Sequence, residues 1–339
     1  MGAGLPASAA VRTRAPNQLA DVSETMVRDG LLLIAGLGLL AFAADRFVLG
    51  AARLSAALKV SPVVIGALVI GFGTSAPEML VTALAAAQGA ADLGYGNLVG
   101  SNVANVLLVL GAAALLSPIS VRTVTLRREV PLMVAAVAAF AMATANGRVG
   151  LTEGLALLAA TVAAVSFVLW TARTDQRAGA ALAVGATSAP PGAPPWHHAL
   201  LALVGLAGTI AGAQMLVTGA TGVARALGVS EAVIGLTIVA IGTSLPELVT
   251  AVAAARRGEP DLVVGNVLGS NIFNSLPVAG VAALLTGVEL DPAFGWSAAA
   301  MVAACLLAAV FLFTGRRLGR REGTVLLALF AAFVAATAL

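Results

Sequence analysis

The sequence predicts an all-α integral membrane protein with ten transmembrane helices in two inverted five-helix repeats, and with broken helices near the middle of the membrane. Three observations predict it: the composition, the lengths of the apolar runs and an internal duplication. Of 339 residues, 60% are hydrophobic and 10% are charged, and the mean hydropathy is +1.00. This composition is typical of a chain in lipid and excludes a water-soluble globular domain.

Apolar runs long enough to cross a bilayer follow one another along the chain. A helix needs about 20 apolar residues to span a ~30 Å hydrocarbon core. The length of the runs and their lack of alternation exclude a transmembrane β-barrel. The ten predicted spans cover about 30–52, 61–88, 95–118, 128–147, 149–172, 197–224, 230–255, 262–286, 293–314 and 322–339.

Two polar segments set the domain organisation. Residues 1–28 are polar and unpatterned, so we expect a disordered N-terminal tail. Residues 173–196 contain a Pro/Gly-rich stretch and are expected to form a linker. The linker separates a first five-helix repeat, 29–172, from a second, 197–339. Because five is odd, the second repeat enters the membrane from the opposite side, and the repeats are inverted.

The basic residues predict the orientation. If the N-terminus lies outside, 14 Lys and Arg residues fall in cytoplasmic loops and only Arg148 and Arg225 in outer loops, as the positive-inside rule requires. The linker is then cytoplasmic, in a multi-pass protein of the cell inner (plasma) membrane. The three arginines of the tail are exceptions, and a start at Met26 would remove two of them. The basic residues form no patch typical of nucleic-acid binding.

One motif occurs twice, 169 residues apart. Gly73-Thr-Ser-Ala-Pro-Glu78 and Gly242-Thr-Ser-Leu-Pro-Glu247 each place a proline and a carboxylate inside an apolar span. Proline lacks an amide hydrogen, so Pro77 and Pro246 should break their helices and release the carbonyl groups just before them. In lipid, such carbonyls are tolerated only where they face protein or a cavity.

Glu78 and Glu247 are the only acidic residues deep inside a predicted span. A central acidic residue costs about 2.5–3.5 kcal/mol on insertion scales. No Lys or Arg lies at a comparable depth to neutralise them, so their partners should be mobile cations or protons. For the glycine and proline alone, a packing kink is the alternative interpretation.

Neutral oxygen donors accompany the glutamates. The Gly-Ser-Asn-Xaa-Xaa-Asn elements at 100–105 and 269–274 place a serine and an asparagine four residues apart, on one helix face. For any single one of these side chains, interhelical hydrogen bonding is the alternative role. As a set, the oxygens suit Ca²⁺, whereas the lack of clustered Cys or His argues against zinc or copper. The candidate ligands are Glu78, Glu247, Thr74, Thr243, Ser75, Ser244, Ser101, Ser270, Asn105 and Asn274.

With these motifs the chain resembles the sodium/calcium exchanger family, of the cation/Ca²⁺ exchanger superfamily, in its prokaryotic form and over essentially residues 30–339. The motifs are similar to that family's alpha-1 and alpha-2 repeats, here 66–111 and 235–280. The resemblance implies that the two glutamates are central ligands shared by Ca²⁺ and Na⁺. It also implies that the two threonines offer backbone oxygens, that the four serines serve flanking Na⁺ sites, and that Asn105 and Asn274 complete the middle of the site.

The chain departs from some relatives at two places. Potassium-dependent exchangers are among the relatives with Asp at the position of Asn274. The amide removes a negative charge and argues against potassium coupling. The short linker 173–196 has no counterpart of the large acidic regulatory domain of animal exchangers, so allosteric Ca²⁺ control by such a domain is not expected.

The sequence therefore predicts a secondary active antiporter, functional as a monomer, that exchanges Ca²⁺ for Na⁺ by alternating access of one central site. It predicts no cofactor; the partners are the lipid bilayer and the transported ions. Ca²⁺/H⁺ exchange is the nearest alternative, because protons also occupy carboxylates. A passive cation channel is an alternative of a different class. An enzyme is disfavoured because no His-Glu-Xaa-Xaa-His or catalytic aspartate pair occurs within the spans.

Overall fold

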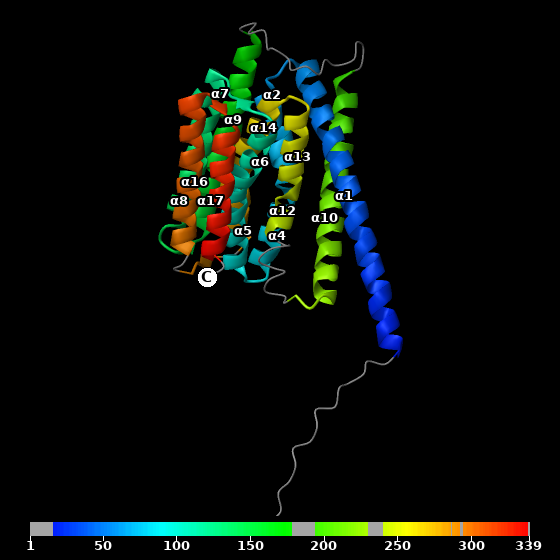
Figure 1. The fold of residues 1–339 in the computed structure, drawn as a ribbon. Helices are drawn as coiled ribbons and strands as arrows, with labels where there is room; N and C mark the ends of the chain where they lie inside the picture. Colours follow the sequence, from blue (N-terminus) through cyan, green and yellow to red (C-terminus); the bar gives the residue numbers. More distant parts are fainter. Residues whose placement is uncertain (1–15, 178–193, 230–239, 286, 292–293, 338–339) are drawn as a thin grey trace, which may run out of the picture.

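The computed structural model describes residues 16–177, 194–229, 240–285, 287–291 and 294–337. Over these ranges the helices run side by side as a bundle, with the pair α1 and α10 along one side of it (Figure 1). The predicted all-α class is confirmed. The bounds are α1 (Pro16–Leu58), α2 (Pro62–Ile65), η1 (Gly66–Gly71), α3 (Phe72–Thr74), α4 (Ala76–Ala87), α5 (Ala91–Ala104), η2 (Asn105–Val109), α6 (Leu110–Leu116), α7 (Thr123–Arg127), α8 (Glu129–Thr144), α9 (Leu151–Arg177), α10 (Pro195–Ala226), α12 (Ala240–Thr243), α13 (Leu245–Arg256), α14 (Pro260–Phe273), η4 (Asn274–Val278), α15 (Ala279–Leu285), α16 (Phe294–Gly315) and α17 (Arg320–Thr337). The elements labelled η are π-helical.

Six stretches of the described chain are long and apolar enough to cross a membrane. A seventh is a bent pair, Pro62–Thr74 followed by Ala76–Ala87, whose parts differ in direction by 43°. All seven coincide with predicted spans and make this a multi-pass membrane protein. The six are Thr25–Leu58, Leu93–Leu116, Leu151–Thr174, Pro195–Ala226, Pro260–Leu285 and Phe294–Gly315.

The other three predicted spans are represented in part. Spans 128–147 and 322–339 correspond to the shorter helices α8 and α17. The span 230–255 ends with α13, but residues 230–239, where the predicted alpha-2 repeat also starts, lie outside the described residues. The count of ten therefore stays a prediction.

Helix α1 corrects the predicted N-terminal boundary. It begins at Pro16, so residues 16–28 are helical and do not belong to a disordered tail. Proline suits the first turn of a helix, and the polar residues after it contain no glycine or further proline before Gly30. At the predicted linker, α9 continues to Arg177 and α10 begins at Pro195.

The duplication recurs in the helix boundaries. Helices α4, α5 and α6 and the π-helical η2 begin 169 residues before α13, α14, α15 and η4, respectively, and each pair has equal length. Two short antiparallel ladders connect the halves. Strand β1 (Ile119–Ser120) pairs with β4 (Arg317–Leu318), and β2 (Arg148–Val149) pairs with β3 (Val288–Glu289).

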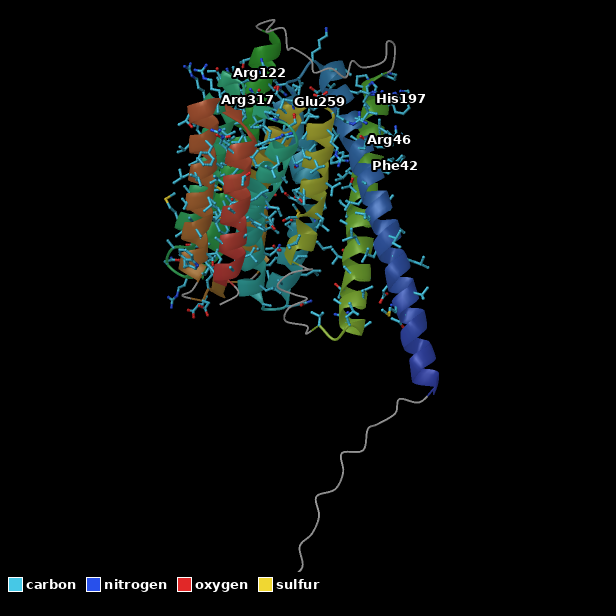
Figure 2. All side chains as sticks on the ribbon, in the orientation of Figure 1. Phe42, Arg46, Arg122, His197, Glu259 and Arg317 are labelled. Carbon is cyan, nitrogen blue, oxygen red and sulfur yellow. The ribbon has the colours of Figure 1, made fainter. Side chains whose placement is uncertain are left out.

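The labelled basic residues of the loops that are predicted to be cytoplasmic lie at one end of the bundle (Figure 2). Arg122 and Arg317 lie at the same end, together with Glu259 and His197 at the start of α10 (Figure 2). This arrangement agrees with the predicted grouping of these loops on one side of the membrane.

Helices α1 and α10 pack closely through glycines. A Cβ atom on Gly205 would lie 2.5 Å from the backbone nitrogen of Phe47, and one on Gly212 would lie 2.5 Å from that of Leu40. Small residues allow such approach, and in lipid the resulting van der Waals contact drives helix association. Helix α1 is further tied to the end of α13 by the Asp45 carboxylate, whose two oxygens accept from Arg257 at 2.8 and 2.7 Å.

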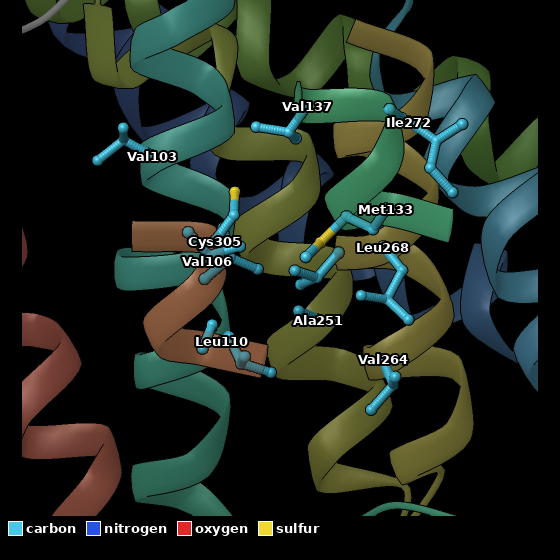
Figure 3. Close-up of a cluster of buried hydrophobic side chains, with 14 of the residues drawn as sticks. Val103, Val106, Leu110, Met133, Val137, Ala251, Val264, Leu268, Ile272 and Cys305 are labelled. Atoms are coloured by element: carbon cyan, nitrogen blue, oxygen red, sulfur yellow. The ribbon is translucent and has the colours of Figure 1, made fainter. Parts of the chain in front are cut away.

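The centre of the bundle is a crossing of η1 with α14. A Cβ atom on Gly66 would meet the Cα atom of Gly265 at 2.9 Å, and one on Gly71 would meet the nitrogen of Ser270 at 2.7 Å. Buried apolar side chains of α14 form a cluster with those of α8, α13, α16 and η2 (Figure 3). The crossing brings the sequence motif of one repeat against that of the other.

Candidate ion-binding site

Both motifs break their helices. Ser75 separates α3 from α4, with φ −78° and ψ 4°, and Ser244 separates α12 from α13, with φ −89° and ψ 5°. Pro77 and Pro246 stand second in α4 and α13, where a missing N–H is tolerated. The breaks predicted from the prolines are therefore present, within one or two residues of them. Each glutamate follows in the first turn of the new helix, where the helix dipole favours a carboxylate.

The two glutamates are buried inside the protein. Glu78 and Glu247 are 0% and 1% exposed, and Glu247 contacts Ser75, which lies three residues before Glu78 in the chain. Oε1 of Glu78 accepts from Oγ of Ser101 at 3.4 Å, and Oε1 of Glu247 accepts from Oγ of Ser75 at 3.5 Å. The second contact joins the repeats, so residues that are 172 positions apart in sequence share one site.

Neither carboxylate has a basic partner in the part of the chain that the structure describes. Within the described ranges, no Lys, Arg or His forms an ion pair with Glu78 or Glu247, and Oε2 of each accepts no hydrogen bond. An uncompensated buried charge is strongly unfavourable. The arrangement therefore suits a mobile cation that supplies the missing charge.

The threonines are held by asparagines of the opposite repeat. Oγ1 of Thr74 lies 3.0 Å from the carbonyl oxygen of Ile70 and 3.3 Å from Oδ1 of Asn266. Nδ2 of Asn266 also donates to the carbonyl oxygen of Glu247 at 3.1 Å. In the other half, Thr243 donates to Oδ1 of Asn97 at 3.4 Å.

Asn97 and Asn266 are thus site residues that the predicted ligand set omits. They lie 169 positions apart, as the motifs do. That shared offset is the signal by which the sequence could have identified them.

The serines occupy unequal positions. Oγ of Ser270 donates to the carbonyl oxygen of Gly71 at 3.2 Å and lies 3.5 Å from Oγ1 of Thr74. Oγ of Ser244 is buried and has no hydrogen-bond partner. Ser270 therefore bridges the motifs, whereas the Ser244 hydroxyl is available to a ligand.

Asn105 and Asn274 are both buried, but their amides differ. Nδ2 of Asn105 donates to Oδ1 of Asn271 at 3.0 Å, and Oδ1 of Asn105 has no partner. Neither Oδ1 nor Nδ2 of Asn274 has a partner. No hydrogen bond joins either residue to the glutamates.

Side-chain contacts thus join six of the ten predicted residues in three pairs, and several buried oxygens are left without a hydrogen-bond partner. The directly linked residues are Glu78, Ser101, Ser75, Glu247, Thr74 and Ser270. Buried oxygens without a partner are typical where a hard cation binds, because Ca²⁺ takes six to eight oxygen ligands. The unpartnered side-chain oxygens of the predicted set belong to Glu78, Glu247, Ser244, Asn105 and Asn274.

A cavity of about 550 Å³ reaches the two breaks. Both prolines and Thr243 line it, together with Gln214 and Arg225 of α10. These α10 residues lie in the half of the helix remote from His197, toward the predicted outer side. The cavity therefore lies on that side of the motifs.

Comparisons with known proteins agree with this geometry. A family model for "Sodium/calcium exchanger protein" matches residues 30–170 and 197–339. The chain is 39% identical over 268 residues to the inner membrane protein YrbG of Escherichia coli (strain K12), covering 77% of this chain and 81% of that protein. It is 30% identical over 344 residues to the sodium/calcium exchanger MaX1 of Methanosarcina acetivorans, covering 90% and 97%. A solved structure of the sodium-calcium exchanger NCX_Mj matches with a TM-score of 0.80 and 32% identity, over 91% of this chain and 98% of that one.

Proposed function

Because the chain belongs to the sodium/calcium exchanger family, we propose that it is a secondary active antiporter that exchanges Ca²⁺ for Na⁺ by alternating access of its central site. The observation that carries the proposal is the burial of Glu78 and Glu247, one from each repeat, where the two motifs contact each other, with no basic partner among the described residues. Two carboxylates balance the charge of one Ca²⁺.

The ligands are assigned by chemistry and position. The two glutamates are the central ligands of both ions, and Asn105 and Asn274 complete the middle of the site. Flanking Na⁺ positions are served by Ser75, Ser101, Ser244 and Ser270, and backbone oxygens are contributed by Thr74 and Thr243. Carboxylate, hydroxyl and carbonyl oxygens all suit hard cations. Ca²⁺ and Na⁺ are transported ions here, and no cofactor is needed.

Competition for the carboxylates supplies the coupling. Ca²⁺ and Na⁺ cannot both occupy Glu78 and Glu247, so each ion leaves before the other binds. A Na⁺ gradient can then drive Ca²⁺ without any chemical reaction. The protein is a transporter and not an enzyme. The amide of Asn274 makes the exchange independent of potassium.

Inverted repeats supply alternating access. Two five-helix repeats of opposite orientation can exchange conformations around a fixed midplane site. The cavity between α4, α10 and the α12–α13 break supports an entrance from the outer side. In this arrangement the ten helices cross the inner membrane with the N-terminus outside, the 173–196 linker is cytoplasmic, and a monomer suffices.

Neutralising a central glutamate tests the proposal. In vesicles, Glu78→Gln or Glu247→Gln should lower Na⁺-dependent Ca²⁺ uptake at least about 100-fold, because a charged ligand contributes about 3 kcal/mol or more. The matched control is Glu153→Gln. Glu153 caps its helix by accepting from the nitrogen of Gly150 at 2.9 Å, remote from the site, so this variant should transport. Full transport by Glu78→Gln would contradict the proposal.

A further inference from the structure

We infer that Asn271 is a positioning residue that turns the side-chain amide of Asn105, so that its oxygen is free for the cation. The inference rests on the proposed function and concerns the same site. Asn271 is not among the predicted ligands, and it is completely buried. Its role follows from which of its neighbours can accept and which can donate a hydrogen bond.

The donor side of Asn271 is fixed by its surroundings. Nδ2 of Asn271 lies 3.4 Å from the carbonyl oxygen of Asn102, 3.8 Å from Sδ of Met133 and 3.5 Å from Sγ of Cys305. A carbonyl oxygen and a thioether sulfur accept hydrogen bonds and cannot donate them. Met133 and Cys305 reach this buried layer from α8 and α16 (Figure 3). The amide nitrogen of Asn271 therefore has to face them.

The orientation of Asn105 follows from that of Asn271. With its nitrogen committed, Asn271 offers Oδ1 to Asn105, which donates from Nδ2 at 3.0 Å. A reversed Asn105 amide would set two acceptor oxygens against each other and lose this bond. Oδ1 of Asn105 is therefore the atom without a protein partner. It is a preorganised oxygen, which lowers the ordering cost of ion binding.

The opposite repeat lacks this arrangement. Asn102, the equivalent of Asn271 at the 169-residue offset, donates to Oγ of Ser275 at 2.9 Å and lies 3.3 Å from Sδ of Met301. It makes no hydrogen bond to Asn274, whose two amide atoms are both unpartnered. The two middle positions are therefore unequal: Asn105 is oriented before the ion arrives, and the ion orients Asn274.

Equilibrium binding of radioactive Ca²⁺ to the purified full-length protein in detergent tests the inference. Asn271→Leu keeps the side-chain shape and removes both polar groups. We expect its Ca²⁺ Kd to rise about 10-fold, within the range for loss of a residue that orients a metal ligand. The matched control Asn102→Leu removes an equally buried asparagine of the other repeat and should change the Kd less than about 3-fold. An equal effect of both variants would overturn the inference.

Variants of Asn105 distinguish a positioning role of Asn271 from a purely structural one. In an Asn105→Ala background, Asn271→Leu should cause no further loss of affinity, because it acts only through Asn105. Asn105→Asp should restore affinity to Asn271→Leu, since a carboxylate presents an oxygen in either orientation. A further loss in the Asn105→Ala background would assign Asn271 a structural role only. If Asn271→Leu does not elute as a folded protein, Asn271→Ala carries the same expectations.

The outcomes also distinguish this inference from the proposed function. A wild-type protein without saturable Ca²⁺ binding would contradict the proposed function itself. Normal binding by the wild type together with an unchanged Kd for Asn271→Leu would overturn only the role of Asn271.

Discussion

The buried oxygens of the site fall into two kinds, those with a hydrogen-bond partner and those without. Oγ of Ser270 donates to Gly71, and Oγ of Ser275 accepts from Asn102, so both hydroxyls connect helices. Oγ of Ser244 does neither. Since a hydroxyl in lipid normally finds a partner, an unpartnered one is the better candidate for an ion ligand.

This contrast predicts different consequences for two serine variants. Ser244→Ala breaks no hydrogen bond and should leave the unfolding free energy within about 0.5 kcal/mol. The Na⁺ concentration for half-maximal exchange should rise about 5- to 10-fold, equivalent to about 1–1.4 kcal/mol. Thermal unfolding and Na⁺ titration of Ca²⁺ uptake in vesicles measure the two effects.

Ser275→Ala is the matched control. It removes the oxygen that accepts from the buried Nδ2 of Asn102 and leaves that nitrogen only Sδ of Met301. This change should cost about 1–3 kcal/mol of stability, with an unchanged Na⁺ titration. A Ser244→Ala variant that loses stability and keeps its Na⁺ titration would reverse the assignment.

The sequence predicts charged site residues better than neutral ones. The sequence identifies Glu78 and Glu247 as site residues because a carboxylate inside the membrane is costly and is therefore typical of a functional site. The sequence does not assign roles to Asn97, Asn266 and Asn271, because a buried amide can form an interhelical contact or support a ligand equally well. Their roles depend on which atoms of the other repeat face them, and only the folded chain decides that.

At the scale of elements, the prolines predict the helix breaks at the two motifs, but the sequence does not predict the π-helical segments. Pro77 and Pro246 lack amide donors, and this local effect can be predicted from the sequence alone. The π-helical turns at Gly66–Gly71 and Asn105–Val109 contain no proline, whereas the one at Asn274–Val278 contains Pro277. Segments of this kind occur frequently at functional sites. Here η1 is one of the two helices of the central crossing, and η2 and η4 begin at the two middle asparagines.

The contact between α1 and α10 gives a prediction on one helix. A Cβ atom on Gly36 would lie 2.5 Å from the nitrogen of Leu216, whereas one on Gly38, two residues on, would meet nothing within 4 Å. Gly36→Ala should therefore destabilise the protein by about 1–3 kcal/mol through overpacking. Gly38→Ala should leave stability unchanged or raise it by up to about 1 kcal/mol, because alanine favours the helix. Thermal unfolding in detergent compares them, and equal midpoints would contradict the close contact.

At the scale of the molecule, the duplication predicts the two-repeat architecture but does not predict the strand pairs that connect the halves. The offset of 169 residues recurs in helix boundaries from α4 to α15, as the two motifs predict. The ladders β1–β4 and β2–β3 have only two residues in each strand. Strands so short leave no periodic pattern, and their partners are set by the packing of the helices around them. The sequence does not predict the helical start of α1, because its polar residues resemble those of a tail.

The central claim is that Na⁺ and Ca²⁺ take turns at one site. The most direct measurement is radioactive Ca²⁺ uptake into proteoliposomes under an outward Na⁺ gradient, an outward H⁺ gradient, or no gradient of either ion. The account predicts uptake with the Na⁺ gradient alone, which stops when Na⁺ is equal on both sides and is unaffected by removal of K⁺. Uptake driven only by the H⁺ gradient would replace Na⁺ with H⁺ as the coupling ion. Uptake of the same size with no opposing ion would indicate a passive channel and contradict exchange.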